Sequence, residues 1–394
     1  MQKMKLTKEE NEFLQGKHGN AAKKAMEILV ALGKIYGAKR LIPVESVQIA
    51  GVSYHNLGDA GLELLEEMAQ DAVVIVPATT LNPAGMDLEN WKALGISEAF
   101  AEKQRRIIDA FKKMGVITTC TCTPYIVGNM PLYGQHIAWS ESSAVCFANS
   151  VLGARTNREG GFSSLASALT GKTPEYGLHL DKNRQPKVAV EVKAKLSDVS
   201  DFGALGKAIG DKIGNLIPFI TGIEKASIEE LKSFCASIAT FGGTAMFHMK
   251  GITPDKTKVP KKKIVITKED IEKAKTELTD KDEIDFIAIG CPHATLSEIK
   301  AIAERLKDKK VKKEFWITCA RPIKNISDMM GYTSIIEKAG AKFACDTCMA
   351  VAPLKGRFKA MMTNSAKACF YGRGSNSFKV KIASLEECIE EAIR

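Results

Sequence analysis

The stretch GVITTCTCTPY, residues 115–125, joins a short apolar run to two cysteines one residue apart. Residues 116–119 are short and apolar enough for a buried strand, and Cys120 and Cys122 follow that strand directly. The two thiols could be core packing, a redox pair or ligands of a metal. Their neighbours in the fold decide among these three interpretations.

Short apolar runs alternate with amphipathic segments along the first half of the chain, at 41–49, 62–68, 73–76, 100–114 and 116–119. This alternation is typical of parallel strands joined by crossover helices. A capping-box pattern at Thr7 to Glu10 and helical spacing over 21–32 predict that helices begin the fold.

The same alternation resumes after a basic, proline-bearing segment, residues 254–263. Expected strands and helices follow at 284–289, 296–306, 315–318, 326–339, 341–344 and 378–393. We therefore predict an α/β fold with two parts: residues 1–253, which carry the substrate-binding loops, and residues 264–394, with 254–263 as a linker.

The composition indicates a soluble protein, because 45% of the 394 residues are hydrophobic and 26% are charged. No apolar run is long enough to span a membrane and the first residues do not resemble a signal peptide, so we predict a cytoplasmic protein. The net charge of +10 comes from scattered lysines, concentrated only at 256–263. This pattern favours a solvated linker over nucleic-acid binding, and it is compatible with an anionic substrate.

The ten cysteines fall into different structural settings and are expected to stay as thiols in a reducing compartment. Four lie in predicted helices, where cysteine is usually a small buried hydrophobe: Cys146, Cys235, Cys369 and Cys388. Five lie at or just past the end of a predicted strand: Cys120, Cys122, Cys291, Cys319 and Cys345. Ligands of open α/β sheets bind at that end, so the second group suggests a site.

The pair Cys345 and Cys348 alone has the spacing of a redox motif or of half a zinc site. The chain has no second pair of this spacing to complete a zinc ribbon. Iron-sulfur clusters, by contrast, take thiolates from distant segments. Three protein thiolates on a four-iron cluster leave one iron open as a Lewis acid, an arrangement that suits dehydration.

Six segments together resemble the large, catalytic chain of the aconitase X family, a branch of the aconitase superfamily. They are GNAAKKAMEILVALG (19–33), WSESSAVCFANSVLGARTNREGG (139–161), FGGTAMFHMKGITPD (241–255), IGCPH (289–293), CDTC (345–348) and TNSAK (363–367). The resemblance covers essentially the whole chain. It implies a multi-lobed aconitase-superfamily fold, with parallel-sheet lobes around an iron-sulfur site.

The resemblance also implies a cofactor and a partner. The cofactor is a [4Fe-4S] cluster with one open iron, held by Cys122, Cys291 and Cys345; Cys120 and Cys348 are the alternative ligands beside them. The partner is a separate small swivelling subunit, because the chain ends at Arg394 without room for that domain. The active site would then close between the two chains.

Two dehydrations are known in this family, and the resemblance implies one of them. The first converts (R)-5-phosphomevalonate to trans-anhydromevalonate 5-phosphate in the modified mevalonate pathway of archaea, and the second acts on cis-3-hydroxy-L-proline. The two-chain arrangement and the lysine-rich and isoleucine-rich sequence favour phosphomevalonate.

The same resemblance assigns the proton-abstracting base to Ser365, in the segment TNSAK. A serine is a weak base unless its alkoxide is stabilised, and either Lys367 or the environment of the cluster-bound carboxylate is expected to help. The structural alternative is that Asn364 and Ser365 only cap a helix.

Three segments at strand or helix ends supply the predicted substrate-binding residues: Gly51, Val52, Ser53, Asn82, Pro83, Glu141 and Ser142. Backbone amides and a hydroxyl after a strand suit an anion, and a carboxylate at a helix start complements the helix dipole. As alternatives, these residues are ordinary turns or first-turn residues. We interpret five further residues as supporting or structural: His55, His136, His293, Arg155 and Arg158.

Two hypotheses from other classes remain open. The basic net charge is compatible with an RNA-binding regulatory relative of aconitase that has lost its cluster. A thiol oxidoreductase would instead use Cys345 and Cys348 as its redox pair.

Overall fold

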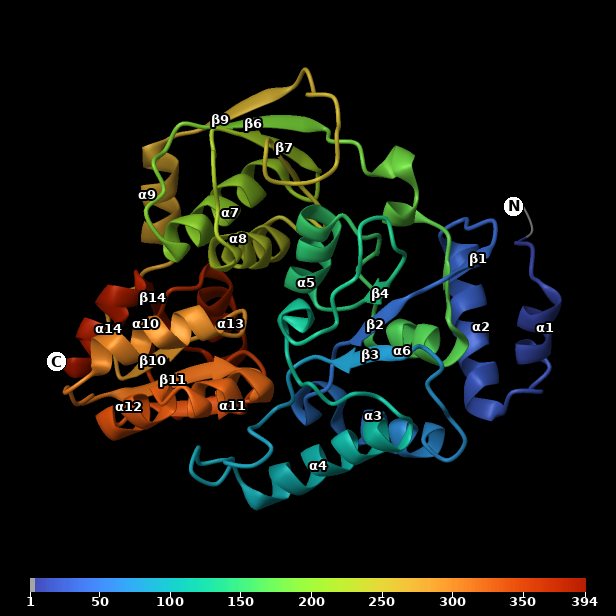
Figure 1. Cartoon of the computed structure of the whole chain (residues 1–394), viewed down its shortest axis with the longest axis horizontal. Helices are drawn as coiled ribbons and strands as arrows, with labels where there is room; N and C mark the ends of the chain where they lie inside the picture. Colours follow the sequence, from blue (N-terminus) through green and yellow to red (C-terminus); the bar gives the residue numbers. More distant parts are fainter. Residues whose placement is uncertain (1–3) are drawn as a thin grey trace.

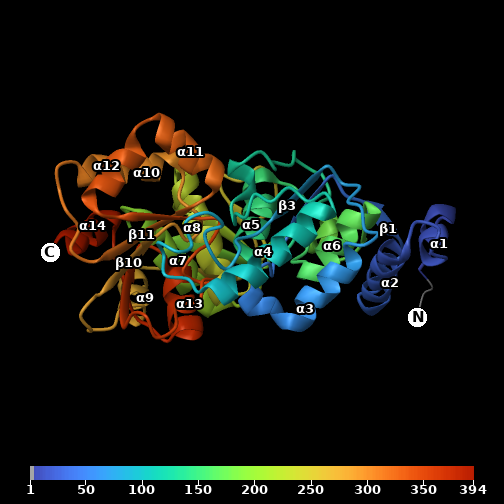
Figure 2. The same ribbon diagram turned by 90° about the horizontal axis from the view of Figure 1, so that it is seen from below.

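Three parallel sheets organise the chain into three lobes in the computed structural model, which describes residues 4–394 (Figure 1). The view turned by 90° places the N-terminal helices at one end of the molecule and the C-terminal lobe at the other (Figure 2). In each sheet the first strand in the sequence lies between strands that come later, so the chain builds one side and then crosses to the other.

The first lobe surrounds a sheet in which β2 (Ser46–Ile49) lies between β3 (Ala78–Leu81) and β4 (Ala138–Trp139). An antiparallel pair, β1 (Leu41–Pro43) and β5 (Lys172–Pro174), lies beside it. The helices are α1 (Lys8–Leu14), α2 (Asn20–Ile35), α3 (Tyr54–Met68), α4 (Glu98–Lys113), α5 (Ser142–Phe147) and α6 (Gly161–Thr170). Short helical turns occupy Pro124–Ile126, Ala148–Leu152, Gly177–His179 and Asp181–Asn183.

Of two local predictions for this lobe, one is confirmed and one is wrong. The capping box is confirmed, because the Thr7 hydroxyl accepts from the Glu10 backbone N–H and the Glu10 carboxylate accepts from that of Thr7. The strand predicted at 73–76 is wrong: Val74 and Ile75 donate to the carbonyls of Met114 and Ala168 instead of pairing in a ladder. The strand of this region is β3.

The middle lobe has a four-stranded sheet in the order β8 (His248–Met249), β7 (Pro218–Thr221), β6 (Val188–Val192) and β9 (Lys263–Ile266). Its helices are α7 (Val199–Ile213), α8 (Ile228–Phe241) and α9 (Lys268–Glu277). Because β9 pairs with β6, residues 263–277 belong to this lobe rather than to the C-terminal one. The molecule therefore has three lobes where the sequence predicted two.

The C-terminal lobe has five parallel strands in the order β12 (Lys342–Cys345), β11 (Glu314–Cys319), β10 (Phe286–Ile289), β13 (Ala360–Thr363) and β14 (Lys379–Ile382). Its helices are α10 (Leu296–Leu306), α11 (Arg321–Met329), α12 (Tyr332–Ala339), α13 (Ala366–Asn376) and α14 (Leu385–Ile393). The sheet separates two apolar cores, since successive side chains of a strand point to opposite faces.

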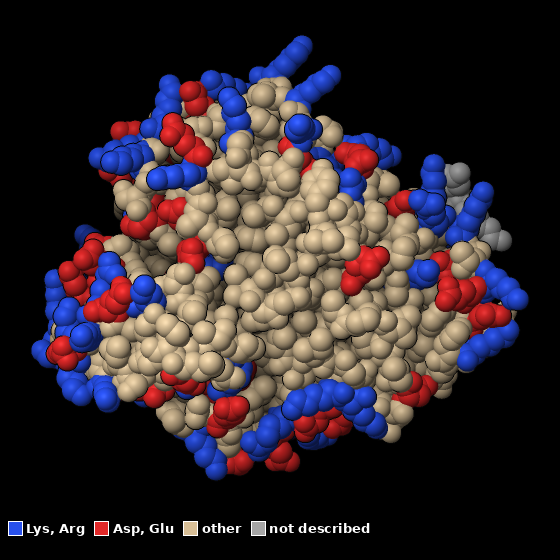
Figure 3. Space-filling view, in the orientation of Figure 1, with Lys and Arg blue, Asp and Glu red and all other residues tan. Residues whose placement is uncertain are grey.

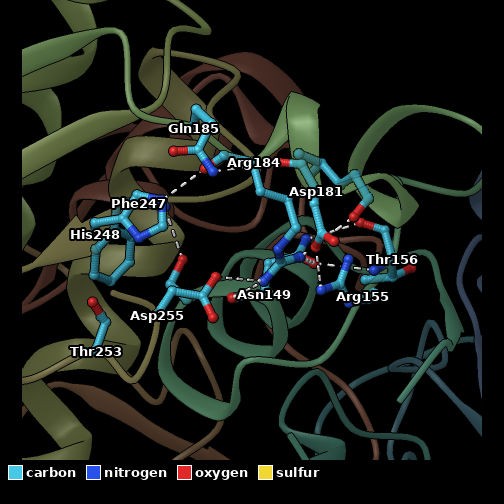
Figure 4. Close-up of polar contacts among 12 residues, drawn as sticks. Asn149, Arg155, Thr156, Asp181, Arg184, Gln185, Phe247, His248, Thr253 and Asp255 are labelled. Carbon is cyan, nitrogen blue, oxygen red and sulfur yellow. Dashed lines mark hydrogen bonds and ion pairs between the residues drawn. The ribbon is translucent and has the colours of Figure 1, made fainter. Parts of the chain in front are cut away.

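Polar contacts join the lobes. The Arg184 guanidinium donates to the Asn149 carbonyl (3.0 Å) and to the Asp255 carboxylate (3.1 Å), and His248 Nε2 lies 2.7 Å from the Arg184 carbonyl (Figure 4). Between the first and third lobes, Arg321 contacts Asp87 at 2.6 Å. These buried, charge-assisted contacts hold the lobes at defined positions.

Charged side chains gather at the periphery of the face drawn in Figure 3, and basic and acidic residues are interspersed there. Basic side chains project at the top of that view, where Figure 1 places the segment that precedes β9. Within residues 4–394, none of the helices has the length and apolar character needed to cross a membrane.

Candidate active site

The carboxyl ends of the first and third sheets face each other across a pocket of about 300 Å³. In both sheets the chain order reverses beside the first strand, at β2 and at β10, and ligands of open α/β sheets bind at such points. The lining residues are Ala50, Gly51, Asn56, Asn82, Pro83, Cys122, Ser140, Glu141, Ser142, Arg158, Gly290, Cys291, Pro292, Cys348, Ala350, Val351, Lys367, Tyr371 and Ser375. Fold topology thus brings distant loops to one site.

Three cysteines reach this pocket from three different loops: Cys122, Cys291 and Cys348. Each keeps 8% of its surface exposed, whereas Cys120 and Cys345 are fully buried. All ten cysteines of the chain are free thiols. Soft thiolates select iron-sulfur clusters, zinc and copper(I), so this donor set fits a metal cofactor.

The structure does not bring Cys345 to the pocket with Cys122 and Cys291. Cys345 is the last residue of β12, and its side chain points to the face of the sheet that carries Phe343. Its sulfur lies 3.9 Å from that of Cys319, the residue opposite it in β11. Cys291 and Cys348 belong to the core on the other face.

Burial keeps the three pocket thiols protonated when nothing is bound. It raises the pKa of Cys122 and of Cys291, and it raises the pKa of Cys348 to about 12. A bound cation would reverse this preference, because thiols ligate metals as thiolates and release their protons. No group of three His, Cys, Asp or Glu side chains among residues 4–394 converges on a single metal ion. A cluster differs in this respect, since its ligands bind separate irons.

A buried ion pair lies opposite the cysteines. Lys367, in the first turn of α13, donates to the Glu141 carboxylate and to the Ser142 hydroxyl, 3.3 Å away. Burial alone would raise the pKa of Glu141, but the Lys367 charge and hydrogen bonds lower it to about 2. Burial would lower the pKa of Lys367, and Glu141 raises it instead. Both groups are therefore charged at neutral pH, and Lys367 cannot act as a base.

Five of the seven predicted substrate-binding residues line the pocket: Gly51, Asn82, Pro83, Glu141 and Ser142. Asn82 donates to Glu141 at 2.8 Å, while its buried carbonyl oxygen has no partner. Val52 and Ser53 do not line the pocket, and the Val52 side chain packs in the core of the first lobe. Ser53 caps α3 and donates to the Val351 carbonyl at 3.0 Å, so its role in the structure is to join two loops.

Ser365 lies behind the pocket wall. Its hydroxyl accepts from the Ala368 backbone N–H at 3.2 Å, as a helix cap does, and it also faces the Cys291 thiol. Only 3% of the residue is exposed. The capping contact is therefore present, and the catalytic role of Ser365 stays a prediction.

Tyr371, Ser375 and Asn56 line the pocket but are not among the predicted site residues. Lys367, Tyr371 and Ser375 are spaced by four residues, which places them on one face of α13. That spacing was the available signal. Asn56 carries no such signal, because it reaches the pocket only through the packing of α3 against the first sheet.

Models of the three aconitase X domains match almost the whole chain. The first domain matches residues 3–182, the second residues 186–276 and the third residues 284–394. The large subunit of phosphomevalonate dehydratase from Methanocaldococcus jannaschii is 49% identical to the chain, over 98% of this chain and 100% of that protein. The chain belongs to the aconitase X family.

Other aconitase X proteins extend this comparison. The phosphomevalonate dehydratase large subunit of Thermococcus kodakarensis is 48% identical, over 99% of this chain and 100% of its own. A crystal structure titled as holo-form aconitase X from Thermococcus kodakaraensis superposes with a TM-score of 0.92 at 47% identity, covering 99% and 100% of the two chains. The cis-3-hydroxy-L-proline dehydratase of Pseudomonas aeruginosa is 33% identical, and the match covers 97% of this chain but 68% of that protein.

The family and the fold predicted from the sequence are thus confirmed, and they extend over the three lobes. The chain's domain matches end and begin close to the lobe boundaries seen in the structure, at 182–186 and 276–284. The pocket described above lies between the first and third of these domains.

Proposed function

We propose that the chain is the large subunit of a phosphomevalonate dehydratase, a hydro-lyase that forms trans-anhydromevalonate 5-phosphate. The observation that carries this proposal is the match to four archaeal proteins of that name at 46–49% identity, each over at least 94% of both chains. The hydroxyproline dehydratases match at 32–33%, over 68% of their length. A more distant phosphomevalonate dehydratase large subunit, 33% identical, still matches over 95% of its length.

The proposed cofactor is an iron-sulfur cluster held by Cys122, Cys291 and Cys348. Support comes from their shared pocket, and Cys348 takes the place that the sequence analysis gave to Cys345. When bound, a [4Fe-4S] cluster with an open iron supplies a Lewis acid for the leaving hydroxyl.

The substrate carries a tertiary alcohol between a carboxylate and a phosphate, and dehydration removes the hydroxyl together with a proton from the carbon beside the carboxylate. Arg158 is the pocket cation that makes no ion pair within the described part of the chain, and its guanidinium suits a carboxylate or a phosphate. Gly51, with φ +77°, exposes backbone in a conformation that favours glycine, and Asn82 offers a free acceptor. These residues would bind and orient the substrate.

The Glu141 and Lys367 pair would fix the polar wall opposite the thiols. Because Lys367 stays protonated, it stabilises negative charge that develops in the pocket. We keep Ser365 as the proposed base: it lies at the N-terminus of α13, where the helix dipole stabilises an alkoxide.

The proposed partner is a separate small subunit, as the name "large subunit" of the relatives implies for those proteins. We propose a cytoplasmic two-chain enzyme whose pocket closes against that subunit. Nucleic-acid binding has no support beyond the net charge, because acidic and basic side chains are mixed on the face in Figure 3.

The test is to produce the large and small chains together without oxygen and to assay both candidate substrates. We expect dehydration of (R)-5-phosphomevalonate, visible absorption from thiolate-to-iron charge transfer, and iron and sulfide in the complex. Dehydration of cis-3-hydroxy-L-proline without reaction on phosphomevalonate would overturn the substrate assignment. Anaerobic protein without iron would overturn the proposed cofactor.

A further inference from the structure

One fully buried histidine contacts all three loops that carry the pocket cysteines. His293 follows Cys291 by two residues, so it belongs to the first loop itself. Its ring Nδ1 lies 2.9 Å from the hydroxyl of Thr121, the neighbour of Cys122. Its Nε2 lies 2.9 Å from the carbonyl of Thr347, the neighbour of Cys348.

The partners of His293 determine how its ring is protonated. The Thr347 carbonyl can only accept, so Nε2 carries the hydrogen and donates it. Nδ1 is then the acceptor, and the Thr121 hydroxyl donates to it. The Thr121 oxygen in turn accepts from the Thr123 backbone N–H at 3.2 Å. Each of these three contacts pairs one donor with one acceptor, so the network is directional.

The backbone of His293 adds two more contacts. Its N–H donates to the sulfur of Cys122 at 3.2 Å, so this contact joins two of the cysteine loops through a pocket thiol. Its carbonyl accepts from the buried Lys232 ammonium of α8 at 2.8 Å, and Lys232 also pairs with Glu298 at 2.5 Å. Residues from all three lobes therefore meet at His293.

We propose that His293 is a positioning residue that fixes the three cysteine loops relative to one another, so that Cys122, Cys291 and Cys348 present their thiols to the same cofactor. This inference rests on the proposed iron-sulfur site. It extends that site beyond its ligands, because His293 does not line the pocket and acts through Thr121, Thr347 and Cys122.

A buried histidine that does not contact the cysteine loops offers a matched comparison. His248 is also buried (1% exposed), and its Nε2 also hydrogen-bonds a backbone carbonyl, that of Arg184, but it lies among the residues of Figure 4, away from the cysteine loops. Removing the His248 imidazole costs packing and one hydrogen bond, and removing the His293 imidazole costs packing and two. Only the loss of His293 should also loosen the thiols.

The experiment compares His293→Leu, His293→Gln and His248→Leu in the two-chain complex, reconstituted anaerobically with ferrous iron and sulfide. Iron and sulfide per chain, the visible absorption spectrum and the retention of iron during chelator challenge are measured, with thermal unfolding as the fold control. Loss of an outer-shell partner typically weakens metal binding about 10- to 100-fold, and we expect that loss for His293→Leu. The amide of Gln can still donate to the Thr347 carbonyl, so His293→Gln should retain iron within about threefold of wild type. His248→Leu should bind iron as wild type does.

Thr121→Val provides a milder variant if His293→Leu does not fold. It removes only the hydroxyl that donates to Nδ1, and we expect iron retention to fall several-fold. Wild-type iron content and chelator resistance in His293→Leu, or in Thr121→Val where the leucine variant is unfolded, would overturn the role of His293. Equal loss in His248→Leu would overturn it as well. A wild-type complex without iron would instead overturn the proposed site and, with it, this inference.

Discussion

Two cysteine pairs of this chain share one arrangement, although the spacing within each pair differs. In Cys120 and Cys122, and again in Cys345 and Cys348, the first thiol is fully buried in a core and the second reaches the pocket. Cys120 packs in the core of the first lobe, and Cys345 packs against Cys319 in the third. Cys345 ends β12, whereas the strand expected at 116–119 is reduced to an isolated bridge at Ile117 before Cys120. The comparison teaches that the earlier thiol of each pair serves the core and that the later one serves the site.

The largest difference in iron content and activity is expected between variants of the first pair, Cys120 and Cys122. Cys122→Ser should lose the proposed cluster and all measurable dehydration, since hydroxyl oxygen is a poor ligand for iron in a thiolate site. Cys120→Ser should keep the iron and most of the activity, at a cost of about 1–3 kcal/mol in the free energy of unfolding for the buried hydroxyl. Anaerobic iron analysis and chemical unfolding of both variants measure this difference. Equal iron loss in both would remove the distinction between the two positions.

The pocket that the second thiol of each pair reaches also holds a buried ion pair, formed by Lys367 and Glu141. Lys367→Met would leave the buried Glu141 carboxylate without its cation, which should cost about 3–5 kcal/mol of stability and abolish activity. The matched control is Lys207→Met, which removes a lysine paired with Asp211 and Glu277 outside the pocket. Unfolding curves and dehydration rates should show a smaller stability loss for the control and wild-type activity. Wild-type activity in Lys367→Met would contradict the role of this pair.

Two carboxylates near the cysteine pairs should contribute to stability with opposite pH dependence: Glu141 in the pocket and Asp346 beside Cys345. Glu141, on the pocket side, has a pKa of about 2 in the fold, below its ordinary value of 4.5. Its contribution to stability is therefore present above pH 4.5 and is lost as the pH falls toward 2; it amounts to at most about 3 kcal/mol. In metal-free protein, the stability difference between wild type and Glu141→Gln should shrink over that range.

Asp346, in the turn beside Cys345, should show the opposite slope. Burial raises its pKa to about 6 from an ordinary value of 3.8. Its contribution is full below pH 3.8 and is lost as the pH rises through 6. Asp346→Asn should therefore gain stability relative to wild type between pH 4 and 6, as measured by urea unfolding. If the stability difference from wild type changed with pH in the same direction for Glu141→Gln and Asp346→Asn, this prediction would be contradicted.

The smallest effect is expected at Asp87, whose side chain binds the backbone of Cys345. The Asp87 carboxylate accepts from the Cys345 backbone N–H at 2.8 Å and pairs with Arg321. Asp87→Asn should cost about 1–3 kcal/mol in the free energy of unfolding, as expected for a weakened buried polar group. Iron retention should stay within a few-fold of wild type, because the proposed ligands do not depend on Cys345. A chelator assay that shows complete iron loss would contradict this expectation.

The sequence predicted much of this fold because hydrophobic periodicity follows local geometry. The alternation of strands and helices was accessible in this way. Glu141 followed from its place at a helix start, whereas Cys122, Cys291 and Lys367 followed from the resemblance to the aconitase X family. The boundary near 263 was missed because β9 pairs with β6, some 75 residues earlier in the chain, and strand pairing between distant segments leaves no local signal.

The choice between Cys345 and Cys348 could not be made from sequence for a related reason. A strand end places successive side chains on opposite faces, so which cysteine reaches the site depends on where the strand stops and how the next turn is built. Here β12 ends at Cys345, and Asp346 adopts φ +62°, which redirects the chain toward the pocket. Neither feature is visible in the spacing CDTC.

Iron content of Cys345→Ser and Cys348→Ser tests the central claim most directly, with both variants produced anaerobically beside the small subunit. The account predicts wild-type iron, sulfide and visible absorption in Cys345→Ser. It predicts more than about 100-fold weaker iron retention in Cys348→Ser, since loss of a ligand should exceed the effect of losing an outer-shell partner. Iron loss in Cys345→Ser together with an intact cluster in Cys348→Ser would contradict it.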